Sequence, residues 1–120
     1  MAKQAFILVY GRDLSLLETR CWVLEGAGFR VQGTADFAET MSVFKAEPPD
    51  LTILCHSLLP EQRKEALDAT RAACPSRKML VLSGGLGELP GHEETATIDA
   101  FDGPRVLVAT VKRLLGETEV

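Results

Sequence analysis

Cys55 and His56 stand side by side directly after an apolar run, and together they bring a thiol and an imidazole. Such a pair could act as a nucleophile with its general base, or could ligate a soft metal ion. Zinc sites, however, take ligands spaced a few residues apart with a second pair elsewhere, and neighbouring residues of a strand point to opposite faces. We therefore expect no metal site and no catalytic pair, and we interpret Cys55 as a small buried thiol beside a loop histidine.

A glycine-rich stretch follows the fourth apolar run of the chain. Gly84, Gly85 and Gly87 could cradle a phosphate if they led into a helix whose N-terminal amides faced the anion. Acidic residues and a proline follow instead, so we expect no nucleotide site here. Each glycine also costs about 1 kcal/mol in a helix interior, so a helix in this interval is predicted to be short or absent.

Five apolar runs have the length and composition of strands. Residues 5–10, 51–55 and 78–82 are nearly continuous aliphatic runs without alternation, which is typical of strands covered on both faces. The other runs are residues 30–33 and a weaker one at 95–98. These runs predict a parallel sheet between two layers of helices.

Helical patterns fill most of the intervals between the apolar runs. Asp13 can cap a helix over residues 14–25, and Asp36 can cap a second helix over 37–45. A third helix can begin at Pro60 and end near residue 73, and a fourth begins around residues 102–104. The inner stripe predicted for the first helix consists of Leu14, Leu17, Cys21 and Leu24.

This alternation predicts an α/β three-layer sandwich over the whole chain. Right-handed crossovers between buried parallel strands favour a five-stranded parallel sheet in the order 2-1-3-4-5, as in flavodoxin-like folds. We expect residues 1–120 to form one domain, because 120 residues is an ordinary domain size.

Composition and charge exclude several classes of function. Hydrophobic residues make up 46% and charged residues 25% of the chain, which is typical of a globular protein. The apolar run at residues 6–10 is too short for a membrane span or a signal-peptide core, so no membrane contact is expected. The net charge of −4 argues against nucleic acid as a partner. Three widely spaced cysteines without an export signal indicate reduced thiols in a cytoplasm.

The order of these elements resembles that of a response-regulator receiver domain, the CheY-like fold of the chemotaxis regulator. The resemblance covers residues 5–115 and implies a part in two-component signal transduction or a phosphorelay. Residues 6–19 are similar to the family's first strand, acidic turn and first helix, and residues 26–31 are similar to the approach to its second strand. Residues 49–54 are similar to its third strand and residues 78–83 to its fourth. Residues 101–107 are similar to the start of its last helix.

The residues that carry phosphotransfer in that family are replaced at most matching positions. Family members hold Mg²⁺ with an acidic pair after strand one, and the matching residues here are Gly11 and Arg12. Asp13 comes next, and we interpret it as the cap of the first helix. The phosphate-accepting aspartate at the end of strand three matches Cys55 or His56, depending on how the residues are counted.

Two further family positions lie at the ends of strands four and five. The switch hydroxyl is retained as Ser83, whereas the family's lysine matches Asp99. The charges are therefore exchanged, and we hypothesise that Arg12 pairs with Asp99 or Asp13 without a metal. The resemblance implies a degenerate pseudo-receiver with no cofactor, whose crevice consists of Gly11, Arg12, Asp13, Cys55, His56, Ser83 and Asp99.

Three functions from different classes fit these observations. The first is a degenerate receiver that is not an enzyme and acts by protein–protein interaction without aspartyl phosphorylation. The second is a phosphorylatable receiver whose site has been misplaced, although no aspartate lies between Asp50 and Asp68. The third is a small-ligand binder or enzyme that uses the crevice at the carboxyl ends of the strands.

A signalling protein without a phosphorylation site must act through its surface, so we expect a homodimer or another protein partner. The candidate interface comprises the last helix and strand five, with Ile98, Phe101 and Val106 as its apolar members. Trp22 lies off the stripe of the first helix, and we expect it to pack at the flank of that helix.

Overall fold

The computed structural model describes residues 4–73, 78–83, 95–100 and 102–116, which form five strands and four helices. The strands are β1 (Phe6–Tyr10), β2 (Arg30–Thr34), β3 (Leu51–Leu54), β4 (Lys78–Ser83) and β5 (Thr95–Asp99). The helices are α1 (Leu14–Gly26), α2 (Phe37–Ala46), α3 (Pro60–Ala73) and α4 (Pro104–Leu114). Each bound that was predicted lies within a residue or two of the observed one, and the end of α4 carried no prediction.

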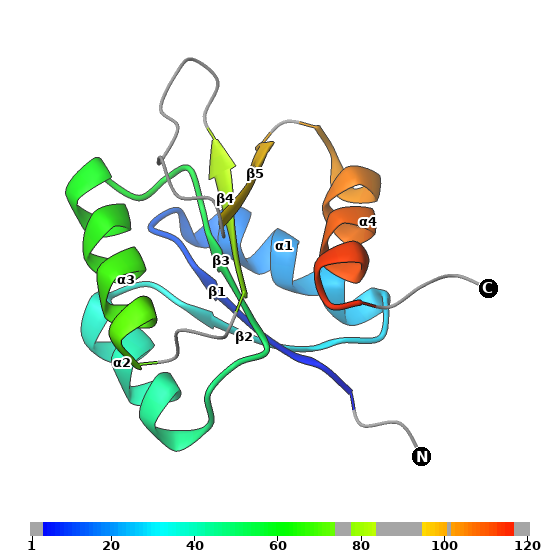
Figure 1. Cartoon of the computed structure of the whole chain (residues 1–120). Coiled ribbons are helices and arrows are strands. Elements are labelled where there is room, and N and C mark those ends of the chain that lie inside the picture. Colours follow the sequence, from blue (N-terminus) through cyan, green and yellow to red (C-terminus); the bar gives the residue numbers. More distant parts are fainter. Residues whose placement is uncertain (1–3, 74–77, 84–94, 101, 117–120) are drawn as a thin grey trace.

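The sheet is parallel throughout, and its strands follow the order β2-β1-β3-β4-β5 (Figure 1). Tyr10 lies beside Thr34 on one side and Leu54 on the other, so these three strands end at a common edge. The predicted α/β three-layer fold and strand order are confirmed. The prediction of a short or absent helix between the fourth and fifth strands concerns residues 84–94, which lie outside the described residues.

Two layers of helices cover the sheet, with α1 and α4 on one face and α2 and α3 on the other (Figure 1). β1 and β3 are buried along their whole length because both of their faces are covered. Val9 and Ile53 pack in a core with residues of α1 and α4, whereas Tyr10 and Leu54 pack with residues of α3. The neighbouring side chains of one strand thus serve two separate cores.

Side-chain caps fix the starts of the first two helices. The Asp13 carboxylate accepts a hydrogen bond from the Leu16 backbone N–H, at 3.1 Å. The Asp36 carboxylate accepts one from the Glu39 backbone N–H, at 2.7 Å. Both predicted caps are confirmed, because each satisfies an N–H group that the helix itself leaves without a partner.

The predicted stripe of α1 is wrong at its first position. Leu14 is 66% exposed, while Leu17, Arg20 and Leu24 are buried. The inner face of α1 therefore follows a spacing of three and four residues from Leu17 and includes a charged side chain. Trp22 is 63% exposed, so the expectation that it packs at the helix flank is also wrong.

Within the described residues, no helix is both long and apolar enough to span a membrane.

Candidate functional site at the carboxyl edge of the sheet

The close approach of Gly11 to Cys55 defines the centre of this edge. A Cβ atom at Gly11 would lie 2.9 Å from the Cys55 Cβ and 3.0 Å from its Sγ, closer than side-chain carbons pack. The Cys55 backbone N–H donates to the Tyr10 carbonyl at 2.9 Å, which extends the pairing of β1 and β3 past the last strand residue. Glycine at position 11 thus leaves the room that the buried Cys55 side chain occupies.

The Ser57 hydroxyl holds the loop between β1 and α1. Its Oγ accepts hydrogen bonds from the backbone N–H groups of Arg12 and Asp13, at 2.9 and 3.2 Å. The loop that resembles the family's acidic turn is therefore tied through its main chain to the segment after β3. Sequence reasoning missed Ser57, because a loop serine next to a proline-initiated helix has no distinctive spacing.

The Arg12 side chain is exposed, and the described residues give it no ion pair with Asp13. The Asp13 carboxylate instead caps α1. The hypothesised pair of Arg12 with Asp13 is therefore wrong. The alternative pair with Asp99 involves a side chain outside the described residues.

Cys55 and His56 do not point to opposite faces of the sheet, as a continuing strand would require. The strand ends at Leu54, and a turn begins at His56. Cys55 packs in the core on the α1 and α4 side, and His56 also turns toward α1, where its Nδ1 lies 3.3 Å from a guanidinium nitrogen of Arg20. The expectation that Cys55 and His56 point to opposite faces is therefore wrong, because the turn that begins at His56 rotates the His56 side chain toward α1.

Arg20 is the residue at this edge that the sequence analysis overlooked. It is 8% exposed, and its Nη2 approaches His56 while its Nη1 is buried with no hydrogen-bond partner among the described residues. A guanidinium has only donors, so in this contact the His56 Nδ1 is the acceptor. The helical spacing from Leu17 to Leu24 could have placed Arg20 on the inner face.

Burial raises the pKa of the Cys55 thiol, although the nearby Arg20 guanidinium acts to lower it. A thiol with a raised pKa is protonated at neutral pH and is a poor nucleophile and metal ligand. Among the described residues, no group of three His, Cys, Asp or Glu side chains could hold a metal ion.

The remaining residues of the predicted crevice lie at the ends of β4 and β5. The register pairs Ser83 with Asp99, which places their backbones at the same edge of the sheet as the end of β3. Their side chains lie outside the described residues, as does Phe101 of the candidate interface. Ile98 is partly buried against the core, and Val106 on α4 is 38% exposed.

Several solved structures share this architecture along almost the whole chain. A CheY-like response regulator receiver domain protein from Methanospirillum hungatei matches with a TM-score of 0.82 and 23% sequence identity, covering 96% of both chains. A response regulator receiver protein from Sinorhizobium medicae matches with a TM-score of 0.81 and 20% identity, covering 98% of both chains. A chemotaxis protein from Vibrio cholerae matches with a TM-score of 0.80 and 19% identity, covering 93% of this chain and 99% of that chain.

The chain has the response-regulator receiver fold. No protein-family model matches the sequence, and no curated protein matches it either. The receiver fold places the described candidate residues at the carboxyl edge of its sheet, around a glycine, a buried thiol and a buried guanidinium. Among the described side chains at this edge, Arg20 is buried and the Asp13 carboxylate is engaged as a helix cap.

Proposed function

We propose that this protein is a receiver-fold module of two-component-type signalling that acts through protein–protein contacts in the cytoplasm, without phosphorylation of an aspartate. Residues 1–120 act as one domain in this proposal. The protein is not an enzyme, and its output depends on which surface a partner recognises.

The observation that carries the proposal is the nature of the residue at the end of β3. Formation of an acyl phosphate needs an accessible carboxylate nucleophile and a divalent cation on hard oxygen ligands. Cys55 offers instead a thiol that is 1% exposed and whose pKa is raised by burial. The neighbouring His56 accepts from Arg20 and is no carboxylate either.

The charge around this position also supports the proposal. The buried guanidinium of Arg20 would repel a divalent cation near the end of β3, and none of the ion pairs among the described residues involves Arg20. The Asp13 carboxylate lies in the loop after β1, but it serves the Leu16 N–H. These groups do not supply the oxygen ligands on which Mg²⁺ depends.

Treatment with acetyl phosphate and Mg²⁺, followed by intact-mass spectrometry, tests the proposal. We expect unmodified protein, while a phosphorylatable receiver mixed into the same reaction gains one phosphoryl group. A stoichiometric, Mg²⁺-dependent phosphoryl adduct on this chain would overturn the proposal, and peptide mapping would then identify the acceptor.

A further inference from the structure

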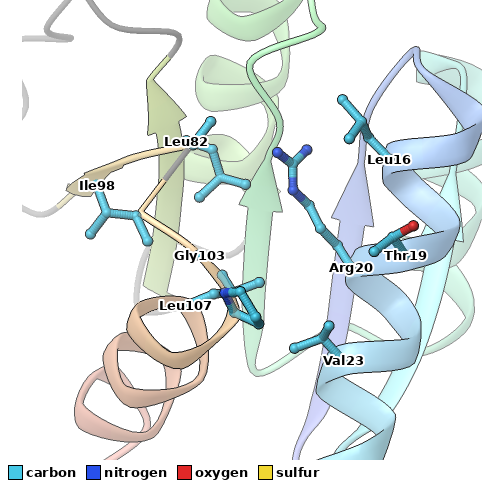
Figure 2. Close-up of a pocket in the computed structure, with 10 residues that line it drawn as sticks. Leu16, Thr19, Arg20, Val23, Leu82, Ile98, Gly103 and Leu107 are labelled. Carbon is cyan, nitrogen blue, oxygen red and sulfur yellow. The ribbon is translucent and has the colours of Figure 1, made fainter.

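A pocket of about 190 Å³ lies between α1 and α4, below the carboxyl ends of β4 and β5 (Figure 2). Its walls are predominantly apolar, with α1 contributing Leu16 and Val23, the strands Leu82 and Ile98, and α4 Leu107. Arg20 is the charged member of the lining. Figure 2 shows its side chain extending from α1 toward the strands, among these apolar groups.

The Arg20 guanidinium is poorly compensated for a buried cation. Its contacts among the described residues are one 3.3 Å approach to the Nδ1 of His56 and a hydrogen-bonding interaction with the buried Cys55 thiol. Its Nη1 is buried, and no described residue forms a hydrogen bond with it. A buried charge without a counter-ion is costly, and buried charges are normally paired. The described residues thus give this guanidinium no anionic partner, and the pocket that it lines can receive one.

We propose that this pocket binds a small monocarboxylate whose apolar body is about the size of an aromatic ring. The carboxylate pairs with Arg20, whose planar fork matches the two carboxylate oxygens. The apolar body lies against Leu82, Ile98 and Leu107. An apolar cavity of about 150 Å³ accommodates benzene, so a pocket of this size suits a benzoate-like molecule.

The lining also discriminates against other anions. Phosphate and sulfate carry further oxygens that need donors, and the apolar walls leave most of them without a partner. A neutral aromatic ligand would fill the same walls but leave the guanidinium uncompensated. Both halves of the ligand, the single negative charge and the apolar body, are therefore required.

Binding requires a small change in Arg20. Its Nη1 is covered, so a side-chain torsion must rotate to bring this nitrogen to the carboxylate. The ligand would then bridge α1 and α4, the two helices of one layer. This proposal does not rest on the proposed signalling function, since it concerns the pocket and not the end of β3.

Titration of ¹⁵N-labelled protein with benzoate, followed by amide NMR shifts, tests the proposal. We expect saturable shifts at Leu16, Val23 and Leu107, with benzamide, the neutral isostere, binding at least about tenfold more weakly. Arg20→Met should weaken benzoate at least about tenfold and leave benzamide unchanged. Arg105→Met, which removes an exposed arginine next to the pocket, should leave the benzoate affinity unchanged.

Ala100→Leu provides a second variant that keeps Arg20 and fills the pocket, and it should abolish benzoate binding even if Arg20→Met does not fold. Equal affinity for benzoate and benzamide, or unchanged benzoate binding by either pocket variant, would overturn the proposal. So would an absence of shifts in the pocket at about 20 mM benzoate, a concentration that detects millimolar binding.

Discussion

Because Gly11 has no side chain, the ends of β1 and β3 can lie close together at this position. Gly11 does not have the positive φ of Gly28 or Gly103, so its backbone tolerates any residue, and what requires glycine is the proximity of Cys55. The first methyl group added there meets the Cys55 Cβ at 2.9 Å. The cost of a substitution is therefore steric.

We predict that Gly11→Ala lowers the free energy of unfolding by about 1–3 kcal/mol, as overpacking in a dense interior does. Urea unfolding measures the change, and Gly26→Ala is the matched control. No atom lies within 4 Å of a Cβ at Gly26, so that helical substitution should stabilise the protein by about 0.5–1 kcal/mol. In a Cys55→Gly background the penalty of Gly11→Ala should shrink, and an undiminished penalty would contradict the steric explanation.

Cys21 makes the stability depend on pH in the alkaline range. Burial, reinforced by Glu25, raises the pKa of its thiol to about 11 from an ordinary value of 9.0. Between these values the unfolded chain loses the proton while the folded protein keeps it, so stability falls as the pH rises through this window. The thiol is partly exposed, so we expect a loss of about 1 kcal/mol, which Cys21→Ala should remove. Urea unfolding of both proteins at about pH 8 and about pH 10.5 checks this, and parallel pH profiles would contradict it.

At the residue level, the sequence reveals chemical types but not which charged side chain is buried. Cys55 could be predicted as buried because a small thiol after an aliphatic run usually is. The spacing from Leu17 to Leu24 is compatible with Arg20 on the inner face, but residue type favours Leu14 there, because charged residues rarely face a core. In α1 the tertiary packing overrides that preference, burying the arginine and exposing Leu14 and Trp22.

At the scale of elements, local signals were sufficient. Continuous aliphatic runs identified β1 and β3, and the acidic caps identified the starts of α1 and α2. An apolar run or a helix cap depends only on residues that are a few positions apart in the chain, so it can be recognised directly in the sequence. The tie from Ser57 to the loop after β1 spans more than forty residues, and no local pattern reports it.

Asp13 tests how much one cap contributes to α1. We predict that Asp13→Ala lowers the free energy of unfolding by about 1 kcal/mol, because the Leu16 N–H loses its acceptor. Asp13→Asn should keep most of that stability, since asparagine caps equally well. Asp36→Ala should cost a similar amount at α2. Urea unfolding measures all three, and equal losses for the alanine and asparagine variants at position 13 would indicate a role other than capping.

At the scale of the whole molecule, the two helix layers differ in what they expose. The layer of α1 and α4 carries Trp22, 63% exposed, and Val106, 38% exposed (Figure 1). On the other side, Leu59 just before α3 is 43% exposed. With Leu14 of α1, which is 66% exposed, three exposed apolar groups lie in this layer, so the α1 and α4 side is the better candidate for self-association.

We predict that the protein is a homodimer at micromolar concentration and pairs through the α1 and α4 layer. A stable dimer buries about 1,200 Å² or more in total, and a charge placed in its centre is strongly unfavourable. Val106→Glu should therefore give a monomer in sedimentation equilibrium, while Leu59→Glu, the matched control on the other layer, should leave the dimer intact. Trp22 is the sole tryptophan of the chain, so its fluorescence should shift to the blue as the dimer forms on concentration. A 13.0 kDa species for the unsubstituted chain would rule out the homodimer and leave a different protein as the partner of this surface.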